Sequence, residues 1–257
     1  MSVRPQGRVL AMLILVLALV AAVLGWLHTN LAMDPAGPGH GFSPPVVETN
    51  RPGAVGPVLR VHAAPALSVV EILTVRVADA RNNYDRQAFG EPWLDVDRNS
   101  CDTRDDVLRR DLTDVQLVKG SRCLVAAGRL SEPYTGRVMD FSRGPDSSKA
   151  IQIDHVVALG DAWRSGAQQL TALQRQNLAN DPLNLIAVDG PTNVDKSDGD
   201  TAAWLPPNKA FRCQYVARQV SVKAAYRLWI TPAEKEAMKR VLDRCPGQQT
   251  LESGYPP

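Results

Sequence analysis

The chain has 257 residues, of which 44% are hydrophobic and 22% are charged. This composition suffices for one domain of ordinary size together with non-globular extensions. The formal net charge is only +2, which excludes a chain that is basic throughout. A surface that binds a polyanion would therefore have to be local.

The N-terminal segment consists of a basic start followed by a long apolar run. Arg4 and Arg8 precede 19 uncharged residues, 9–27, which is close to the roughly 20 residues that span a bilayer. Because no clear small-x-small cleavage site follows, we expect residues 1–33 to form an uncleaved signal anchor, with cleaved secretion as the alternative. The positive flank would keep the N-terminus in the cytoplasm and export the rest of the chain.

The next segment, residues 34–65, contains seven prolines and several glycines and shows no helix or strand periodicity. We expect a disordered linker that holds the domain away from the membrane. The globular domain is then expected over residues 66–247, followed by a short disordered tail over residues 248–257.

The four cysteines all lie beyond the apolar run. In an exported chain an even number of cysteines indicates disulfides, and sequence-local pairing is the simplest of the three connectivities. This pairing joins Cys101 to Cys123 and Cys213 to Cys245. Zinc binding is the alternative, but none of the spacings suits it.

The most informative stretch runs from residue 151 to residue 200. It opens with a short apolar strand, and a second strand over residues 183–188 turns at Asp189, Gly190 and Pro191 into the start of a helix. The expected order is strand, strand, helix. Five polar side chains in this stretch are candidates for a site: Asp154, His155, Asn184, Asn193 and Lys196.

The chemistry of these five side chains is complementary. Asp154 and His155 are neighbours, so they can share a site only where the strand ends or bulges. There, the carboxylate of Asp154 and the amide carbonyl of Asn193 would be oxygen ligands for a hard divalent cation, Mg²⁺ or Mn²⁺. A neutral His155 would be the general base for a water that attacks phosphorus. Asn184 would orient the imidazole, and Lys196 would neutralise charge on the phosphoryl oxygens.

Each of these residues also has an ordinary structural explanation. An Asp-His pair at a strand end is usually a surface pair, and Asn near Gly-Pro usually belongs to a turn. The order and spacing favour a joint site, with 29 residues from His155 to Asn184 and nine from Asn184 to Asn193.

This set of residues resembles the HNH nuclease signature, in particular the HNH domain of the GmrSD restriction-enzyme C-terminal type in exported, actinobacterial-type proteins. The resemblance implies an α+β fold with a ββα-metal core, one catalytic divalent metal and hydrolysis of a nucleic-acid phosphodiester bond. By position it implies His155 as the base, Asp154 and Asn193 as metal ligands, and Asn184 as the Asn that supports the loop. Asn193 stands where many members have His, and no Cys-x-x-Cys pairs flank the motif, so no structural zinc is expected.

An acidic segment over residues 95–106 has three interpretations. Its oxygen-bearing side chains occupy positions 1, 3, 5, 9 and 12 of an EF-hand-like Ca²⁺ loop: Asp95, Asp97, Asn99, Thr103 and Asp106. The match is partial, because position 6 is Ser100 rather than Gly and position 12 is Asp rather than Glu. The second interpretation follows from the family resemblance, which covers about residues 83–226. It implies that Arg104 faces the candidate site around His155 and contacts a phosphate. The third interpretation is a disulfide-pinned loop whose acids cap helices and pair with nearby arginines.

The rest of the domain reads as mixed helix and strand. We expect a helix over residues 66–79, strands over residues 115–125 and 138–141, and a helical insertion over residues 161–180. In this insertion, we expect Trp163 to be a core residue rather than a platform on which a base stacks. A helix over 211–230 and a second one, opened by the capping box of Thr231 and Glu234, form a C-terminal hairpin ending near residue 244. This hairpin would place Cys213 beside Cys245.

The hairpin also contains a local excess of positive charge. Between residues 209 and 244 there are nine Lys or Arg against three Asp or Glu, a local charge of +6. This suits a nucleic-acid backbone, and it is equally typical of a solvated helix surface.

Taken together, these features predict an exported endonuclease, anchored outside the cytoplasmic membrane or secreted, with DNA as the expected substrate and low sequence specificity. No protein partner is implied. One alternative is a non-catalytic, membrane-anchored module that binds nucleic acid or another polyanion. A second is a metal phosphodiesterase that acts on small or lipid diesters.

Overall fold

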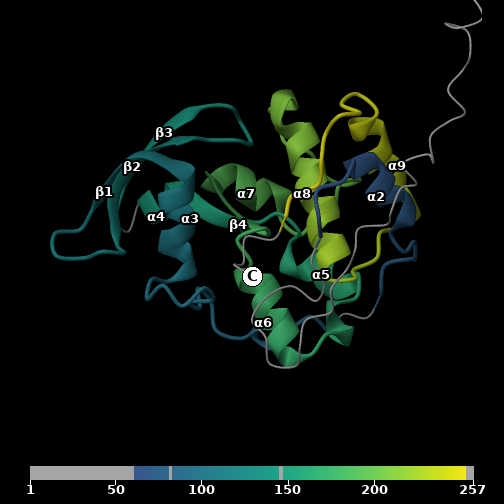
Figure 1. Ribbon diagram of the computed structural model, residues 1–257, viewed down its shortest axis with the longest axis horizontal. Coiled ribbons are helices and arrows are strands. Elements are labelled where there is room, and N and C mark those ends of the chain that lie inside the picture. Colours follow the sequence, from purple (N-terminus) through teal and green to yellow (C-terminus); the bar gives the residue numbers. More distant parts are fainter. Residues whose placement is uncertain (1–60, 81–82, 145–146, 253–257) are drawn as a thin grey trace, which may run out of the picture. The chain divides into compact units, whose positions relative to one another are not determined.

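The computed structural model describes residues 61–80, 83–144 and 147–252 (Figure 1). The expected signal anchor over residues 1–33 and most of the expected linker lie outside the described residues, as do residues 253–257 of the expected tail. In the described part of the chain, no helix is both long and apolar enough to cross a membrane.

The domain extends a few residues beyond both predicted boundaries. Pro65 and Gln249 form a β-bridge, and the Ala66 amide donates to the Gln248 carbonyl. Thr250 is buried, and its amide donates to the Ala64 carbonyl. Residues 248–252, expected to be a disordered tail, are therefore ordered, because the two ends of the domain supply each other with backbone hydrogen-bond partners.

A three-stranded antiparallel sheet contains β1 (Leu112–Leu117), β2 (Val125–Ser131) and β3 (Val138–Ser142), in that order. The apolar pattern predicted one strand over residues 115–125, and this prediction is wrong because the chain reverses there. The Val118 amide donates to the Leu124 carbonyl, and Gly120 adopts a φ of 84°. A positive φ suits glycine, which has no Cβ, so the turn forms without strain.

A separate two-stranded ribbon follows, formed by β4 (Ile151–His155) and β5 (Leu185–Asp189), and it leads into α7 (Gly190–Lys196). The predicted order of strand, strand, helix is confirmed. The Asp189 side chain caps α7 by accepting from the Thr192 amide. Gly190 is needed where the chain leaves β5, because a Cβ there would lie 2.0 Å from the Lys149 carbonyl oxygen.

The two faces of this ribbon are buried against different parts of the domain. Ile151 and Ile153 of β4 share a core with Leu108 of α3 (Thr103–Asp111). On the other face, Ile186 and Val188 of β5 pack with residues of α8 (Arg212–Ala225). The mixed α+β fold expected from the sequence is confirmed, with two small antiparallel sheets among helices.

The insertion between β4 and β5 is helical but interrupted. It contains α5 (Leu159–Arg164), a 3-10 turn η2 (Ala167–Gln169) and α6 (Ala172–Asn180). Gly166 separates the first two with a φ of 123°. Thr171 and Gln174 form a capping box that starts α6. Three further short elements are η1 (Arg86–Phe89), α4 (Ser147–Ala150) and η3 (Lys209–Phe211).

The C-terminal helices α8 and α9 (Pro232–Leu242) pack against each other and against α2 (Ala66–Ile72) (Figure 1). α8 ends at Ala225 rather than near residue 230, and Arg227 adopts a φ of 54° in the turn that follows. α2 stops before residue 79 because Leu73 is extended. The two disulfides have the sequence-local connectivity: Cys101–Cys123 and Cys213–Cys245.

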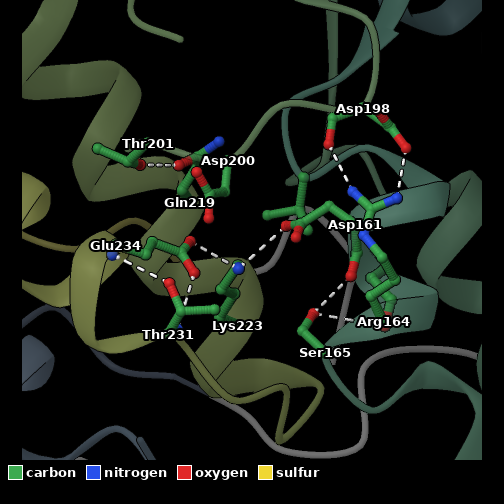
Figure 2. A network of polar contacts seen from close by, with 12 residues as sticks. Asp161, Arg164, Ser165, Asp198, Asp200, Thr201, Gln219, Lys223, Thr231 and Glu234 are labelled. Atoms are coloured by element: carbon green, nitrogen blue, oxygen red, sulfur yellow. Dashed lines mark hydrogen bonds and ion pairs between the residues drawn. The ribbon is translucent and has the colours of Figure 1, made fainter. Parts of the chain in front are cut away.

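A buried ionic cluster joins α5, α8 and α9 (Figure 2). The Lys223 ammonium lies 3.0 Å from Asp161 Oδ2 and 2.6 Å from Glu234 Oε1, and all three side chains are buried. One cation between two carboxylates leaves an excess negative charge in a poorly solvated place. Burial raises the pKa of Glu234 to about 7, although Lys223 lowers it.

Candidate functional site

Asp154 and His155 lie on opposite faces of the β4–β5 ribbon. β4 pairs with β5 in regular register, with Asp154 opposite Ile186 and His155 opposite Leu185. Residues that face each other across an antiparallel pair share a face, and neighbours along a strand alternate. The described strand has no bulge at this position, so the condition for a joint site of the Asp154 and His155 side chains is not met.

The Asp154 face contains a buried polar cluster. Lys196, the last residue of α7, donates from Nζ to Asp154 Oδ1 and to the carbonyl oxygen of His155, at 2.9 Å each. Tyr134, in the turn between β2 and β3, donates its hydroxyl to Asp154 Oδ2 at 2.5 Å. Burial raises the pKa of Asp154, and the Lys196 ammonium partly offsets this effect. Both oxygens of the carboxylate are therefore engaged by protein donors.

The two asparagines of the motif hold backbone and side chains in place. Asn184 is fully buried; its Oδ1 accepts from the Val157 amide, and its Nδ2 donates to the carbonyls of Val157 and Leu178. It thus joins the end of β4 to α6, and these contacts do not include the imidazole of His155. Asn193 donates from Nδ2 to Gln152 Oε1 at 2.9 Å.

The proposed metal ligands do not fit a divalent cation in this arrangement. Asp154 accepts from Tyr134 on one oxygen and from Lys196 on the other, and the Lys196 ammonium, 2.9 Å away, already supplies the neutralising positive charge. A divalent cation would be repelled by that ammonium unless Lys196 moved away. Among the residues that the structure describes, no group of three or more His, Cys, Asp or Glu side chains is placed to hold a metal ion.

His155 has the hydrogen bonding that a general base needs. Its Nε2 lies 2.8 Å from the Ala179 carbonyl oxygen at the end of α6. A carbonyl oxygen only accepts, so Nε2 carries the proton and Nδ1 keeps its lone pair. The pKa of His155 is lowered to about 4, mainly by burial and to a smaller extent by the Arg86 and Lys196 cations. The imidazole is therefore neutral at physiological pH.

The His155 ring lies at the wall of a pocket of about 440 Å³. Most residues of the 85–93 segment line the same pocket, with Asp85, Arg86, Glu91 and Trp93 among them, and so do Leu159 and Ala179. α6 holds this segment in place: Asn180 Oδ1 accepts from the Leu94 amide, and Arg175 Nε donates to the Ala88 carbonyl. The pocket thus combines a neutral imidazole, an exposed guanidinium and an aromatic ring.

Arg86 is the cation that lines the pocket together with His155, whereas the sequence pointed to Arg104. Arg104, the predicted phosphate ligand, lies in α3 and is absent from the pocket lining, and its pKa is lowered by burial and by Arg143. The sequence feature that could have indicated Arg86 is the group of aromatic residues and glycine around it, which includes Tyr84, Phe89 and Trp93. Spacing alone did not favour it over Arg104.

Trp163 supports the pocket from behind, as a partly buried residue packed on a core cluster. Its ring centroid lies 6.3 Å from that of Tyr84 and 6.0 Å from that of Phe89, and its Nε1 donates to Asn83 Oδ1. These contacts agree with the predicted core role.

The acidic segment over residues 95–106 forms a hydrogen-bonded loop. Asp95 and Asp97 accept from the amides of Asn99 and Ser100, and Asp106 accepts from Asn99 Nδ2. The loop is tied to the β1–β2 turn by the first disulfide. Its carboxylates are thus directed at donors of the loop itself. Asp102 also caps α3, as the third interpretation of this segment expects.

The sequence model of a family described as "GmrSD restriction endonucleases, C-terminal domain" matches residues 102–241, which is more than half of the chain. The chain belongs to this family. Membership in the GmrSD C-terminal family supports a nuclease activity for this chain. No solved structure matches the chain.

A curated relative is described as "Uncharacterized secreted protein" and comes from the fungus Arthroderma benhamiae. It is 39% identical to this GmrSD C-terminal family member over 185 residues, which cover 71% of this chain and 86% of the relative. Because this relative is fungal, the actinobacterial part of the expected resemblance is not established. The description of that relative calls it secreted, and the two disulfides of this chain are of the kind that form in oxidising compartments.

Proposed function

We propose that this protein is an extracellular HNH-type nuclease that hydrolyses phosphodiester bonds of nucleic acid, with DNA as its main substrate and His155 as the general base. The observation that carries the proposal is the hydrogen bond from His155 Nε2 to the Ala179 carbonyl, which leaves Nδ1 unprotonated in a residue that lines the pocket. Family membership and the order of β4, β5 and α7 support the same conclusion.

In the proposed reaction a water lies between His155 Nδ1 and the phosphorus of a diester bound in the pocket. Nδ1 accepts a proton from the water as its oxygen attacks phosphorus; the P–O bond to the leaving sugar oxygen breaks, and that oxygen takes up a proton from solvent. The guanidinium of Arg86, across the pocket, stabilises the negative charge that builds on the phosphoryl oxygens. Lys196 acts indirectly, because it holds the carbonyl of His155 and thereby the end of β4.

A catalytic Mg²⁺ or Mn²⁺ on Asp154 and Asn193 was implied by the HNH resemblance. The arrangement of Lys196 around Asp154 does not fit such an ion, so no step of the mechanism is assigned to one. Metal dependence is decided by the experiment below, which includes a chelator. Calcium at residues 95–106 has no role in the proposed reaction.

The experiment uses the protein purified under oxidising conditions, with supercoiled plasmid DNA as substrate. It is run with Mg²⁺ or Mn²⁺ and with a chelator, beside the variants His155→Ala and His62→Ala. His62 is exposed and outside the pocket, so it is the matched control. We expect nicking by the parent protein and by His62→Ala, and a loss of about 10²- to 10⁴-fold in His155→Ala.

Three outcomes would point elsewhere. Cleavage by His155→Ala at the parent rate would overturn the assignment of the base. Tight binding of DNA without cleavage under any metal condition would favour the non-catalytic binding module. Turnover of a small chromogenic diester without cleavage of DNA would favour a phosphodiesterase that acts on small substrates.

A further inference from the structure

A second concave surface lies at the end of the α8–α9 hairpin. It is a groove of about 520 Å³ between residues 201–213 and α9, and it shares no lining residue with the His155 pocket. Four cations line it: Lys209, Arg212, Arg240 and Arg244. The rest of its lining is small, apolar or hydroxyl-bearing: Thr201, Ala202, Leu205, Ala210, Cys213, Ala237 and Val241. No carboxylate is part of the groove.

The four cations of this basic groove form no ion pair with any residue that the structure describes. None of them has a carboxylate within 4.0 Å among the ion pairs of the described residues. The other side of α9 behaves differently, because Lys235 and Lys239 both pair with Glu71. Arg240 lies in the last turn of α9 and Arg244 in the turn that follows the helix; both line the groove, so their like charges repel each other. An anion bound in the basic groove would relieve this repulsion.

The walls of the basic groove are held in position. Arg212 donates from Nε to the Pro206 carbonyl at 2.7 Å, which fixes its guanidinium at the start of α8. The Cys213–Cys245 disulfide joins the start of α8 to the chain that follows α9. The cations therefore converge on a preformed surface, which lowers the entropic cost of binding an extended anion.

We propose that the basic groove is a second nucleic-acid site that binds the phosphodiester backbone outside the His155 pocket. Successive phosphates would contact the cations, and the sugars would lie against the apolar floor around Leu205 and Val241. The choice of nucleic acid as the polyanion rests on the proposed nuclease function. The groove adds affinity for long substrates and takes no part in bond cleavage.

The test compares Arg240→Gln/Arg244→Gln with the matched double variant Lys119→Gln/Arg122→Gln. Both pairs remove two exposed positive charges, and the second pair lies in the β1–β2 turn, away from either pocket lining. Binding of a fluorescein-labelled oligodeoxynucleotide is measured by anisotropy at several salt concentrations, with chelator present. Turnover of bis-(p-nitrophenyl) phosphate is measured in parallel, because this diester is too small to reach both sites.

For Arg240→Gln/Arg244→Gln we expect binding about tenfold weaker near 0.15 M salt, and a salt slope reduced by about 1.4 to 1.8 units, the share of two phosphate contacts. Turnover of the small diester should be unchanged, and Lys119→Gln/Arg122→Gln should bind like the parent. Parent-like binding and salt slope in Arg240→Gln/Arg244→Gln would overturn the proposal. An equal loss in both double variants would also overturn it, because the effect would then follow net charge rather than the groove.

The two proposals fail separately. Absence of all cleavage by the parent, together with groove-dependent binding, would remove the nuclease and keep the nucleic-acid site. Cleavage that depends on His155, together with DNA binding that is unaffected by the groove substitutions, would support the nuclease and overturn the second nucleic-acid site.

Discussion

The ammonium of Lys196 lies 2.9 Å from Oδ1 of Asp154, and both side chains are buried. Removal of one partner leaves the other charge buried and unpaired. Lys196→Met should therefore lower the free energy of unfolding by about 3 to 5 kcal/mol, as measured by chemical denaturation. The double variant Asp154→Leu/Lys196→Met should recover most of this loss, because an apolar pair replaces the ion pair. A single variant as stable as the parent would show that the two charges do not pair.

The acid limb of the pH–rate profile should report the burial of His155. The base works only when deprotonated, and burial lowers its pKa to about 4. We therefore expect kcat/KM for a small chromogenic diester to rise with pH through about 4 and to stay level above it. An acid limb with an apparent pKa near the ordinary histidine value of about 6.5 would show that the imidazole is solvated rather than buried.

Arg86→Gln should change both the rate and the position of that limb. Loss of the guanidinium removes a charge that stabilises the phosphoryl oxygens, so kcat/KM should fall by about 10²- to 10³-fold. Because the Arg86 cation lowers the pKa of His155, its removal should also move the limb to higher pH. Arg104→Gln is the control, since Arg104 is outside the pocket lining. Equal effects of the two substitutions would contradict the assignment of Arg86.

Glu234→Gln should remove a pH dependence of stability. The folded-state pKa of Glu234 is raised from 4.5 to about 7, so the folded protein binds this proton more tightly than the unfolded chain does. The resulting stabilisation is complete below about 4.5 and is lost as pH rises through 7. The difference in unfolding free energy between pH 5 and pH 8, at about equal ionic strength, should be smaller in Glu234→Gln than in the parent. An unchanged difference would mean that the cluster with Lys223 and Asp161 does not take up a proton.

The second disulfide should contribute substantially to stability. Cys213 and Cys245 close a loop with a sequence separation of 32, for which chain entropy gives about 3 to 4 kcal/mol. We expect Cys213→Ala/Cys245→Ala to lose about this amount in thermal or chemical unfolding. Because this disulfide joins the two sides of the basic groove, the double variant should also bind DNA more weakly while turning over the small diester normally. If the variant had the same free energy of unfolding as the parent, the Cys213–Cys245 disulfide would not stabilise the fold.

Local sequence patterns predicted much of the fold. The order of β4, β5 and α7 follows from two short apolar strands and a turn with Asp, Gly and Pro. The capping box at Thr231 and Glu234 starts α9 as expected. Boundaries that depend on distant contacts were missed, such as the reversal at Gly120 and the pairing of Pro65 with Gln249. These depend on partners that are far away in the sequence or on a single positive φ.

The sequence by itself determined which residue types are available for chemistry: one imidazole and one carboxylate at the end of a strand, and a lysine at the end of a helix. Only the tertiary structure decided how they are used. Strand alternation sends Asp154 towards Tyr134 and Lys196, whereas His155 faces the pocket with Arg86. Arg86 and His155 are far apart in the chain. They line one pocket because α6 binds both the segment around residues 88–94 and His155, through hydrogen bonds that no local pattern encodes.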